Sequence, residues 1–257
     1  MRRGPGSLYR RWLSIRYLAT RDRGDVIDFL RDRGVRAGLR TRLDLLRRFT
    51  AVTNQVRGYH TLGEMLAVSR AILARERPVV LEAGCGHGSS TAKLSLAVRA
   101  AGGRLFACDS FRGLPDNSEH HTHMDGRRIE FRTGAFRATL PQVRRTVERF
   151  GAADVVSFHK GWFAETLPAL QTPELDVVVL DVDLVESTRV CLRELVPRLA
   201  PGGVLFTLDG QLRATHELLG STSFWEGEVG VPPPVIDGLG AAKLLVIRKK
   251  AGPEGPA

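Results

Sequence analysis

The chain has 257 residues, of which 43% are apolar, and carries a formal net charge of +10. This length and apolar content suffice for one sizeable domain with a full core, so folding requires neither a disulfide nor a structural metal. The three cysteines form no C-x-x-C pair, which argues against a zinc site and predicts a reducing, cytoplasmic location. No apolar run is long enough to span a bilayer and no apolar leader follows the first arginines, so neither a membrane-spanning nor a secreted protein is expected.

Arginine supplies most of the positive charge. Such a surplus attracts anionic partners, among them nucleic acid, phosphorylated ligands and membrane surfaces. A genome rich in G and C codons also places arginine on solvated surfaces without any anionic partner, and we favour this explanation. Nucleic acid is therefore not a predicted partner.

Residues 1–57 are predicted to form a helical extension. Four apolar residues of its first part share one helical face: Leu8, Trp12, Ile15 and Ala19. A second amphipathic region covers residues 26–49. Because one domain does not need such helices, they predict either a lid over the active site or a contact between subunits, and hence a homodimer or larger homo-oligomer. A helix lying on a membrane surface is the alternative.

Strands and helices alternate through residues 58–250, the predicted main domain. Short apolar runs predict strands at residues 79–83, 104–108, 155–159, 176–181 and 203–208, and a final antiparallel pair at about 229–236 and 243–248. Apolar strands that alternate with helices indicate a parallel sheet covered on both faces. The predicted fold is therefore α/β and Rossmann-like, with seven mostly parallel strands and a C-terminal antiparallel hairpin. Residues 251–257 are predicted to be disordered.

The stretch that begins at Val79 reads V-V-L-E-A-G-C-G-H-G-S-S-T. A short apolar run ends at Glu82, three glycines follow at alternate positions, beginning with Gly84 and Gly86, and a helix is predicted to begin at Ser89. Glycine permits a tight turn and the close approach of a ligand. This order opens a nucleotide-cofactor fold, and the E-x-G-x-G-x-G spacing is typical of motif I of S-adenosylmethionine-dependent methyltransferases. A purely structural turn is the alternative.

Chemistry-bearing residues follow the other predicted strands, at the sheet edge where ligands bind in such folds. Asp109 can accept hydrogen bonds from two ribose hydroxyls or cap a loop. Gly161 and Trp162 can lie against an adenine, unless the tryptophan is an ordinary buried aromatic. Asp181 and Asp209 end neighbouring strands, and two carboxylates held close favour a hard cation such as Mg²⁺ between them. Carboxylates that never meet are the alternative.

Several histidines are candidates for a general base near neutral pH. His60, His216 and a histidine of the loop at residues 119–125 are the alternatives, and the sequence does not choose among them. Within this loop, His121 and His123 fall on one side of an extended chain, which permits a transition-metal site. A polar, exposed loop is the more common outcome.

Four segments together resemble the macrocin O-methyltransferase family, class I enzymes that methylate sugar hydroxyls. The segments are D-S-F-R-G-L-P from Asp109, K-G-W-F-A-E-T-L-P from Lys160, D-V-D-L-V-E-S-T from Asp181 and P-G-G from Pro201. The segment Y-H-T-L-G from Tyr59 is similar to the family's upstream stretch that covers the cofactor. The resemblance spans about residues 58–248.

The resemblance implies S-adenosylmethionine as cofactor, Mg²⁺ as metal and a sugar-containing acceptor. Cofactor contacts are expected from Thr61, Glu82, Gly84, Gly86, Ser89, Asp109, Ser110, Gly161 and Trp162. By this resemblance, Asp109 is expected to contact the ribose, and Gly161 and Trp162 the adenine. The glycine turn is expected to border the methionine part. Asp181 and Asp209 are the implied metal ligands. Asp181 is also a candidate catalytic group near the acceptor hydroxyl, alongside His123 and His60.

One departure from the family bears on the metal. The family has two adjacent acidic residues after the fifth predicted strand, whereas here Leu208 precedes Asp209. Gly210 stands where an aromatic residue is usual, and Val185 where tyrosine is usual. Leucine cannot bind Mg²⁺, so either Asp181 and Asp209 suffice with water or substrate oxygens, or the site is weak, or the enzyme works without metal and relies on a histidine base.

These observations predict an S-adenosylmethionine-dependent O-methyltransferase that acts on a sugar of a glycosylated natural product or oligosaccharide. A nucleic-acid methyltransferase is an alternative suggested by the positive charge. The D-V-D sequence at Asp181 argues against it, because methyltransferases of base amino groups typically carry an Asn/Asp-Pro-Pro-aromatic motif at that place. A catalytically silent, cofactor-binding partner subunit is the other alternative.

Overall fold

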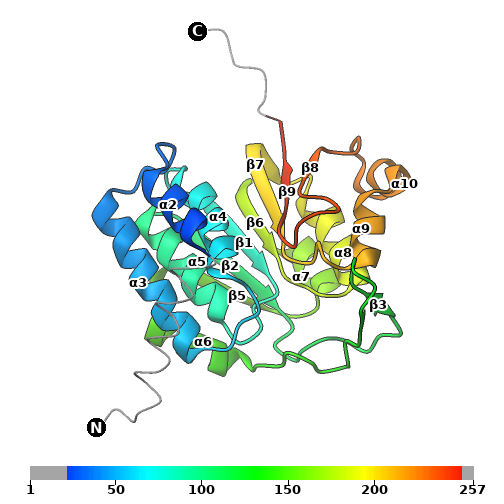
Figure 1. Cartoon of the computed structure of the whole chain (residues 1–257). Helices are drawn as coiled ribbons and strands as arrows, with labels where there is room; N and C mark the ends of the chain where they lie inside the picture. Colours follow the sequence, from blue (N-terminus) through cyan, green and yellow to red (C-terminus); the bar gives the residue numbers. More distant parts are fainter. Residues whose placement is uncertain (1–21, 251–257) are drawn as a thin grey trace.

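A computed structural model describes residues 22–250 (Figure 1). The predicted apolar face of residues 8–19 and the predicted disordered tail at residues 251–257 lie outside the described residues. Within residues 22–250, no helix has both the length and the apolar character needed to cross a membrane.

A seven-stranded sheet forms the centre of the molecule and confirms the predicted architecture. Its strands are β1 (Val79–Ala83), β2 (Arg104–Asp109), β5 (Val156–Lys160), β6 (Leu175–Leu180), β7 (Leu199–Thr207), β8 (Ile236–Asp237) and β9 (Leu245–Arg248), in the order β5-β2-β1-β6-β7-β9-β8. The first five in this order run parallel, whereas β9 is antiparallel to both β7 and β8. The chain proceeds from β1 to β2 on one side and reaches β6 on the other. A crevice at such a switch point is where open α/β sheets bind ligands.

Two layers of helices cover the sheet (Figure 1). One layer contains α2 (Arg23–Arg31), α3 (Leu39–Gln55), α4 (Leu62–Leu73), α5 (Ser89–Ala100) and α6 (Leu140–Phe150), and the other contains α7 (Phe163–Ala169), α8 (Val185–Leu195), α9 (Arg213–Leu219) and the short α10 (Thr222–Phe224). Side chains alternate between the two faces along each strand. In β6, Val177 and Val179 therefore join the core under the first layer, while Val178 and Leu180 join the core under the second.

Several local differences from the sequence prediction have physical causes. The amphipathic region at 26–49 is divided between α2 and α3. The predicted strand at 229–236 is wrong over most of its length: Val229 ends the π-helix η2 (Trp225–Val229), and only Ile236 belongs to β8. Three prolines at 232–234 lack the N–H groups that a strand ladder needs. Helix α7 and the small hairpin of β3 (His121–Thr122) and β4 (Arg128–Ile129) were not predicted.

Candidate active site

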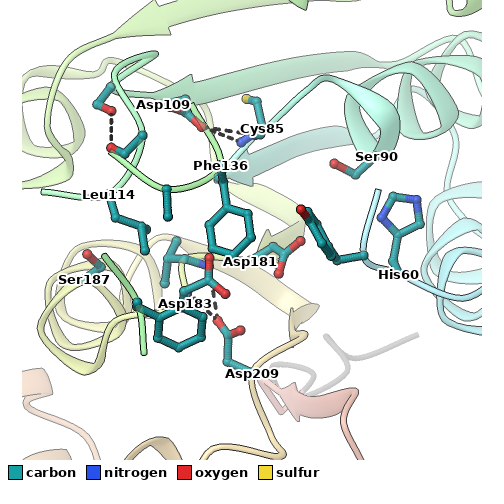
Figure 2. A pocket seen from close by; sticks show the side chains of 18 of the residues that line it. His60, Cys85, Ser90, Asp109, Leu114, Phe136, Asp181, Asp183, Ser187 and Asp209 are labelled. Atoms are coloured by element: carbon teal, nitrogen blue, oxygen red, sulfur yellow. Dashed lines mark hydrogen bonds between the residues drawn. The ribbon is translucent and has the colours of Figure 1, made fainter. Parts of the chain in front are cut away.

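A cavity of about 860 Å³ opens over the carboxyl ends of the parallel strands (Figure 2). Its walls include eleven of the residues singled out from the sequence: His60, Gly84, Gly86, Ser89, Asp109, Ser110, His123, Gly161, Trp162, Asp181 and Asp209. Thr61 and Glu82 are not part of this lining. The volume lies in the upper range of small-molecule pockets, so a nucleoside cofactor and part of an acceptor can share it.

The glycine turn after β1 is tight because three strands meet there. Gly84 has φ +91°, and a Cβ atom at this position would lie 2.0 Å from the backbone oxygen of Asp181. Its own N–H donates to the carbonyl of Cys108, 3.0 Å away. Gly86 has φ +46° and borders the cavity, and a Cβ atom there would meet no other atom within 4 Å. The first glycine thus serves packing between strands, and the second leaves room for a ligand.

Asp109 both holds this turn and faces the cavity. Its Oδ2 accepts the N–H groups of Cys85 and Gly86 at 2.7 and 3.3 Å, and its Oδ1 accepts the N–H of Phe111 at 2.6 Å (Figure 2). Burial raises the pKa of its carboxyl, and these N–H groups partly offset the rise. A carboxylate has about four acceptor sites, so hydroxyl donors can still be accommodated. The neighbouring Ser110 hydroxyl bonds within its own loop, to the Gly113 carbonyl at 3.0 Å.

Glu82 is an unsatisfied acid beside the turn. The side chain is only 1% exposed, and neither carboxylate oxygen has a hydrogen-bond partner among the described residues. Burial, with smaller contributions from Asp181 and Asp109, raises its pKa to about 7, while the nearby Ser90 and Thr91 hydroxyls act in the opposite direction. A buried carboxylate without a donor is costly, and a cationic group on a ligand would satisfy it.

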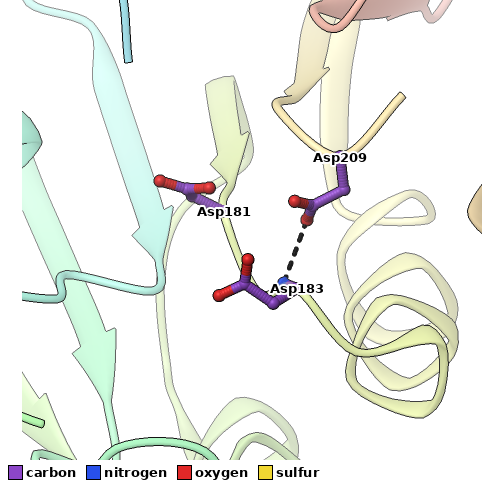
Figure 3. Close-up of side chains that lie close together, drawn as sticks. All are labelled: Asp181, Asp183 and Asp209. Atoms are coloured by element: carbon purple, nitrogen blue, oxygen red, sulfur yellow. Dashed lines mark hydrogen bonds between the residues drawn. The ribbon is translucent and has the colours of Figure 1, made fainter. Parts of the chain in front are cut away.

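Three aspartates meet at the ends of β6 and β7 (Figure 3). Asp181, Asp183 and Asp209 each offer an oxygen within 4.8 Å of the others, and within residues 22–250 they form the one such group of three or more potential metal ligands. The predicted convergence of Asp181 and Asp209 is therefore present. No role was predicted for Asp183, the second acid of the D-V-D sequence that follows β6. Its backbone lies in the left-handed region, with φ +63°.

Burial and mutual repulsion shape the charges of this group. Both raise the pKa of Asp181 to about 7 and that of Asp183 well above its ordinary value, and burial also raises the pKa of Asp209. Lys243 acts in the opposite direction on all three. Asp209 Oδ2 accepts the N–H groups of Val182 and Asp183, each at 3.1 Å. Like charges this close require a proton or a cation, and a set of oxygen donors suits Mg²⁺.

The packing around positions 208 and 210 accounts for the two departures from the family sequence there. Leu208 is 1% exposed and packs in the core under the first helical layer, so it offers the site nothing. At Gly210, a Cβ would lie 2.6 Å from the Ala242 carbonyl and 2.7 Å from that of Lys243. The loop before β9 therefore occupies the space that a larger residue at 210 would need.

The structure places the remaining candidate residues, three histidines and Thr61, in different surroundings. His60 Nε2 lies 2.8 Å from Lys93 Nζ, and burial together with Lys93 lowers the pKa of His60 well below its ordinary value. His123 lines the cavity, whereas His121 is buried with its Nε2 3.3 Å from Glu119 Oε2, and neither histidine belongs to the group of three potential metal ligands found within residues 22–250. The Thr61 hydroxyl is used as a helix cap, accepting the N–H of Glu64 at the start of α4.

Together, the parallel sheet with its antiparallel C-terminal pair, the glycine turn and the acids at the carboxyl ends of β2 and β6 define the fold of a class I, Rossmann-like methyltransferase. Solved structures share it. The O-methyltransferase NovP matches with a TM-score of 0.56 and 20% identity over 83% of this chain and 81% of that one. The calicheamicin methyltransferase CalS11 matches with a TM-score of 0.54 and 17% identity over 96% and 94% of the two chains.

The chain belongs to the macrocin-O-methyltransferase (TylF) family, whose family model matches residues 55–221. A tetracenomycin-type enzyme of Streptomyces olivaceus, 8-demethyl-8-(2,3-dimethoxy-alpha-L-rhamnosyl)-tetracenomycin-C 4'-O-methyltransferase, is 35% identical over 63% of both chains. Demethyldecarbamoylnovobiocin O-methyltransferase of Streptomyces niveus is 30% identical over 51% of this chain and 52% of its own. This chain thus spans less than two thirds of the length of either relative.

Proposed function

We propose that this protein is an S-adenosylmethionine-dependent O-methyltransferase that methylates a sugar hydroxyl of a glycosylated natural product. The observation that carries the proposal is the meeting of the glycine turn and the three aspartates in one cavity. Family membership supports the same reaction, and the relative from Streptomyces olivaceus is named for a substrate that bears a rhamnosyl group. An oligosaccharide is the alternative acceptor. Assays with a panel of acceptors would distinguish it from a glycosylated natural product.

The described residues fit the proposed cofactor in its three parts. The unsatisfied Glu82 and the open space at Gly86 suit the methionine part, Asp109 suits the ribose, and Gly161 with Trp162 suits the adenine. When bound, the cofactor supplies an electrophilic methyl group. The protein's contribution is to align the acceptor oxygen with that group and to exclude water, and such alignment accounts for much of the rate in reactions of this kind.

Aromatic and apolar side chains line the same cavity as the carboxylates and suit the acceptor. Tyr59 and Phe136 meet edge to face with ring centroids 5.0 Å apart, and Phe131 packs beside Phe136 at 6.1 Å. All three line the cavity, as do Leu114 and Met124. A deoxygenated sugar on an apolar aglycone matches such a wall better than a highly hydroxylated oligosaccharide does.

The three aspartates have two proposed tasks. Asp181 and Asp209 would hold Mg²⁺, as the sequence predicted, and the metal would polarise the acceptor oxygen. Asp183 would accept the proton that the hydroxyl loses as its oxygen attacks the methyl carbon. In this displacement the carbon–oxygen bond would form as the carbon–sulfur bond of the cofactor breaks, and S-adenosylhomocysteine would be the leaving group.

Binding and turnover test the proposed function directly. Calorimetric titration is expected to show binding of S-adenosylhomocysteine, and methyl transfer is expected to some member of a panel of glycosylated natural products. Binding without turnover on any sugar acceptor would favour the silent partner subunit. If S-adenosylhomocysteine does not bind at all, the proposal fails.

Asp109→Asn is expected to weaken binding of S-adenosylhomocysteine by about 10- to 100-fold. The amide carries one acceptor oxygen instead of two, and its NH₂ group would face backbone N–H groups that the carboxylate now satisfies. Asp125→Asn is the matched control, because Asp125 also lines the cavity but is exposed and bonded to Arg127. Equal affinity in both variants would remove Asp109 from the cofactor site.

The metal proposal predicts that a chelator lowers turnover and that added Mg²⁺ restores it. Asp209→Asn should weaken Mg²⁺ binding at least about ten-fold, measured by titration of the protein saturated with S-adenosylhomocysteine. If the chelator does not change turnover, the metal proposal is excluded, whereas the proposed methyltransferase activity is not. Proton removal would then rest on Asp183 without a metal, with His123, which lines the same cavity, as the alternative base.

Assembly and location are further parts of the proposal. Leu39 and Leu43 of α3 are 58% and 50% exposed, and such an apolar surface fits the homodimer or larger homo-oligomer expected from the sequence. The cysteines Cys85, Cys108 and Cys191 are all free and buried, which fits a reducing cytoplasm.

A further inference from the structure

Lys93 carries a buried amino group that has no anionic partner within residues 22–250. It lies on α5 with 1% exposure, and none of the ion pairs within residues 22–250 includes it. Its one hydrogen-bond partner in that part of the chain is His60 Nε2, at 2.8 Å. Burial lowers the pKa of Lys93 to about 7. An ammonium group buried beside a neutral ring is costly, and the missing element is a negative charge.

The surroundings of Lys93 open toward the cavity. Ser89 and Ser90 lie three to four residues before it on α5, and both line the cavity, as His60 does. Helical side chains lean toward the N-terminus of their helix, so Lys93 extends toward this first turn. Ser89 is 3% exposed, and its hydroxyl has no hydrogen-bond partner among the described residues. The first turn also offers free N–H groups and the positive end of the helix dipole.

When Lys93 is protonated, its contact with His60 fixes the tautomer of the imidazole. An ammonium group can only donate, so His60 Nε2 must accept and the ring proton sits on Nδ1. The low pKa of His60, caused by burial and by Lys93, keeps the ring neutral. His60 therefore presents an N–H donor, backed by a positive charge, in the wall of the cavity.

We propose that His60 and Ser89 bind the carboxylate of the cofactor's amino-acid part, and that Lys93 is a positioning residue that orients His60 and supplies the positive charge. This inference rests on the proposed function and names residues for one part of its cofactor. Glu82, which lies beside Ser90 and Thr91 of the same turn but is not part of the cavity lining, is the buried acid whose charge would stabilise the ammonium group of the same amino acid. The two sites together select an α-amino acid rather than a plain thioether.

A pair of ligands tests the proposal without relying on catalysis. S-adenosylhomocysteine and its decarboxylated analogue differ only in the carboxylate, and calorimetry gives the ratio of their dissociation constants. Wild type is expected to prefer S-adenosylhomocysteine by about 10- to 100-fold, and Lys93→Met is expected to reduce this preference to about two-fold. Lys250→Met is the control, because it removes the same charge from an exposed residue beside the start of β7.

Each outcome decides a different point. The Lys93→Met variant should still bind the decarboxylated analogue as wild type does, which also shows that its pocket is folded. His60→Phe should lose the same preference, and the double variant should lose no more, because the two residues act as one unit. An unchanged preference in Lys93→Met, or equal loss of both ligands, overturns the proposal. Failure of wild type to bind either ligand instead overturns the proposed function.

Discussion

Asp183→Asn is expected to lower kcat for methyl transfer by about 10²- to 10⁴-fold, the usual range for loss of a general base. Asparagine keeps the shape of the side chain but cannot take a proton from the acceptor hydroxyl. Asp183 suits this task because burial and the neighbouring Asp209 and Asp181 raise its pKa, which makes its carboxylate a stronger base. Its backbone is held at φ +63°, a conformation disfavoured for a residue with a side chain and concentrated at functional sites.

The affinity for S-adenosylhomocysteine separates this effect from damage to the pocket, and it should stay within about two-fold of wild type. Glu186→Gln is the matched control, because Glu186 also lines the cavity but is exposed and pairs with Arg189 at 3.4 Å. Its kcat should change by less than about three-fold. A kcat in Asp183→Asn close to that of Glu186→Gln would exclude Asp183 as the base and return the task to Asp181 or His123.

The main elements of the fold could be predicted because their signals are local. Each parallel strand is a short apolar run that ends in a turn, and the ends of parallel strands meet at one edge whatever the packing. Asp109, Asp181 and Asp209 were located by that rule alone. The C-terminal pair was placed less well. Its first strand is held to Ile236–Asp237 by prolines at 232–234, and the run before them coils into η2.

Asp183 and Lys93 show what the sequence could not supply. Both aspartates follow the last residue of β6, Leu180, and the left-handed backbone of Asp183, with φ +63°, is not apparent from the sequence. The burial of Lys93 depends on α3, α4 and α6, which all pack against α5. Nothing near Lys93 in the sequence distinguishes a buried ammonium from a solvated one.

Gly84→Ala is expected to destabilise the protein by about 2–6 kcal/mol, the sum of a strained backbone and an overpacked contact. The added Cβ would lie 2.0 Å from the backbone oxygen of Asp181, and Gly84 already has φ +91°. Neither partner can move freely, since Gly84 N–H donates to Cys108 and Asp181 N–H donates to Ala83, both at 3.0 Å. The strain therefore falls on the junction between β1 and β6, where Asp181 begins the carboxylate group.

Gly86→Ala isolates the steric part of this effect. Gly86 also has a positive φ, +46°, but a Cβ there meets no atom within 4 Å, so only the backbone preference is lost, about 1–2 kcal/mol. Free energies of unfolding from denaturant titration compare the two variants without a ligand. Because the Gly84 contact displaces Asp181 itself, Gly84→Ala should also lose turnover in the fraction that remains folded. Equal destabilisation by the two substitutions would mean that β1 and β6 can separate at this point, and that the position of Asp181 does not depend on the glycine.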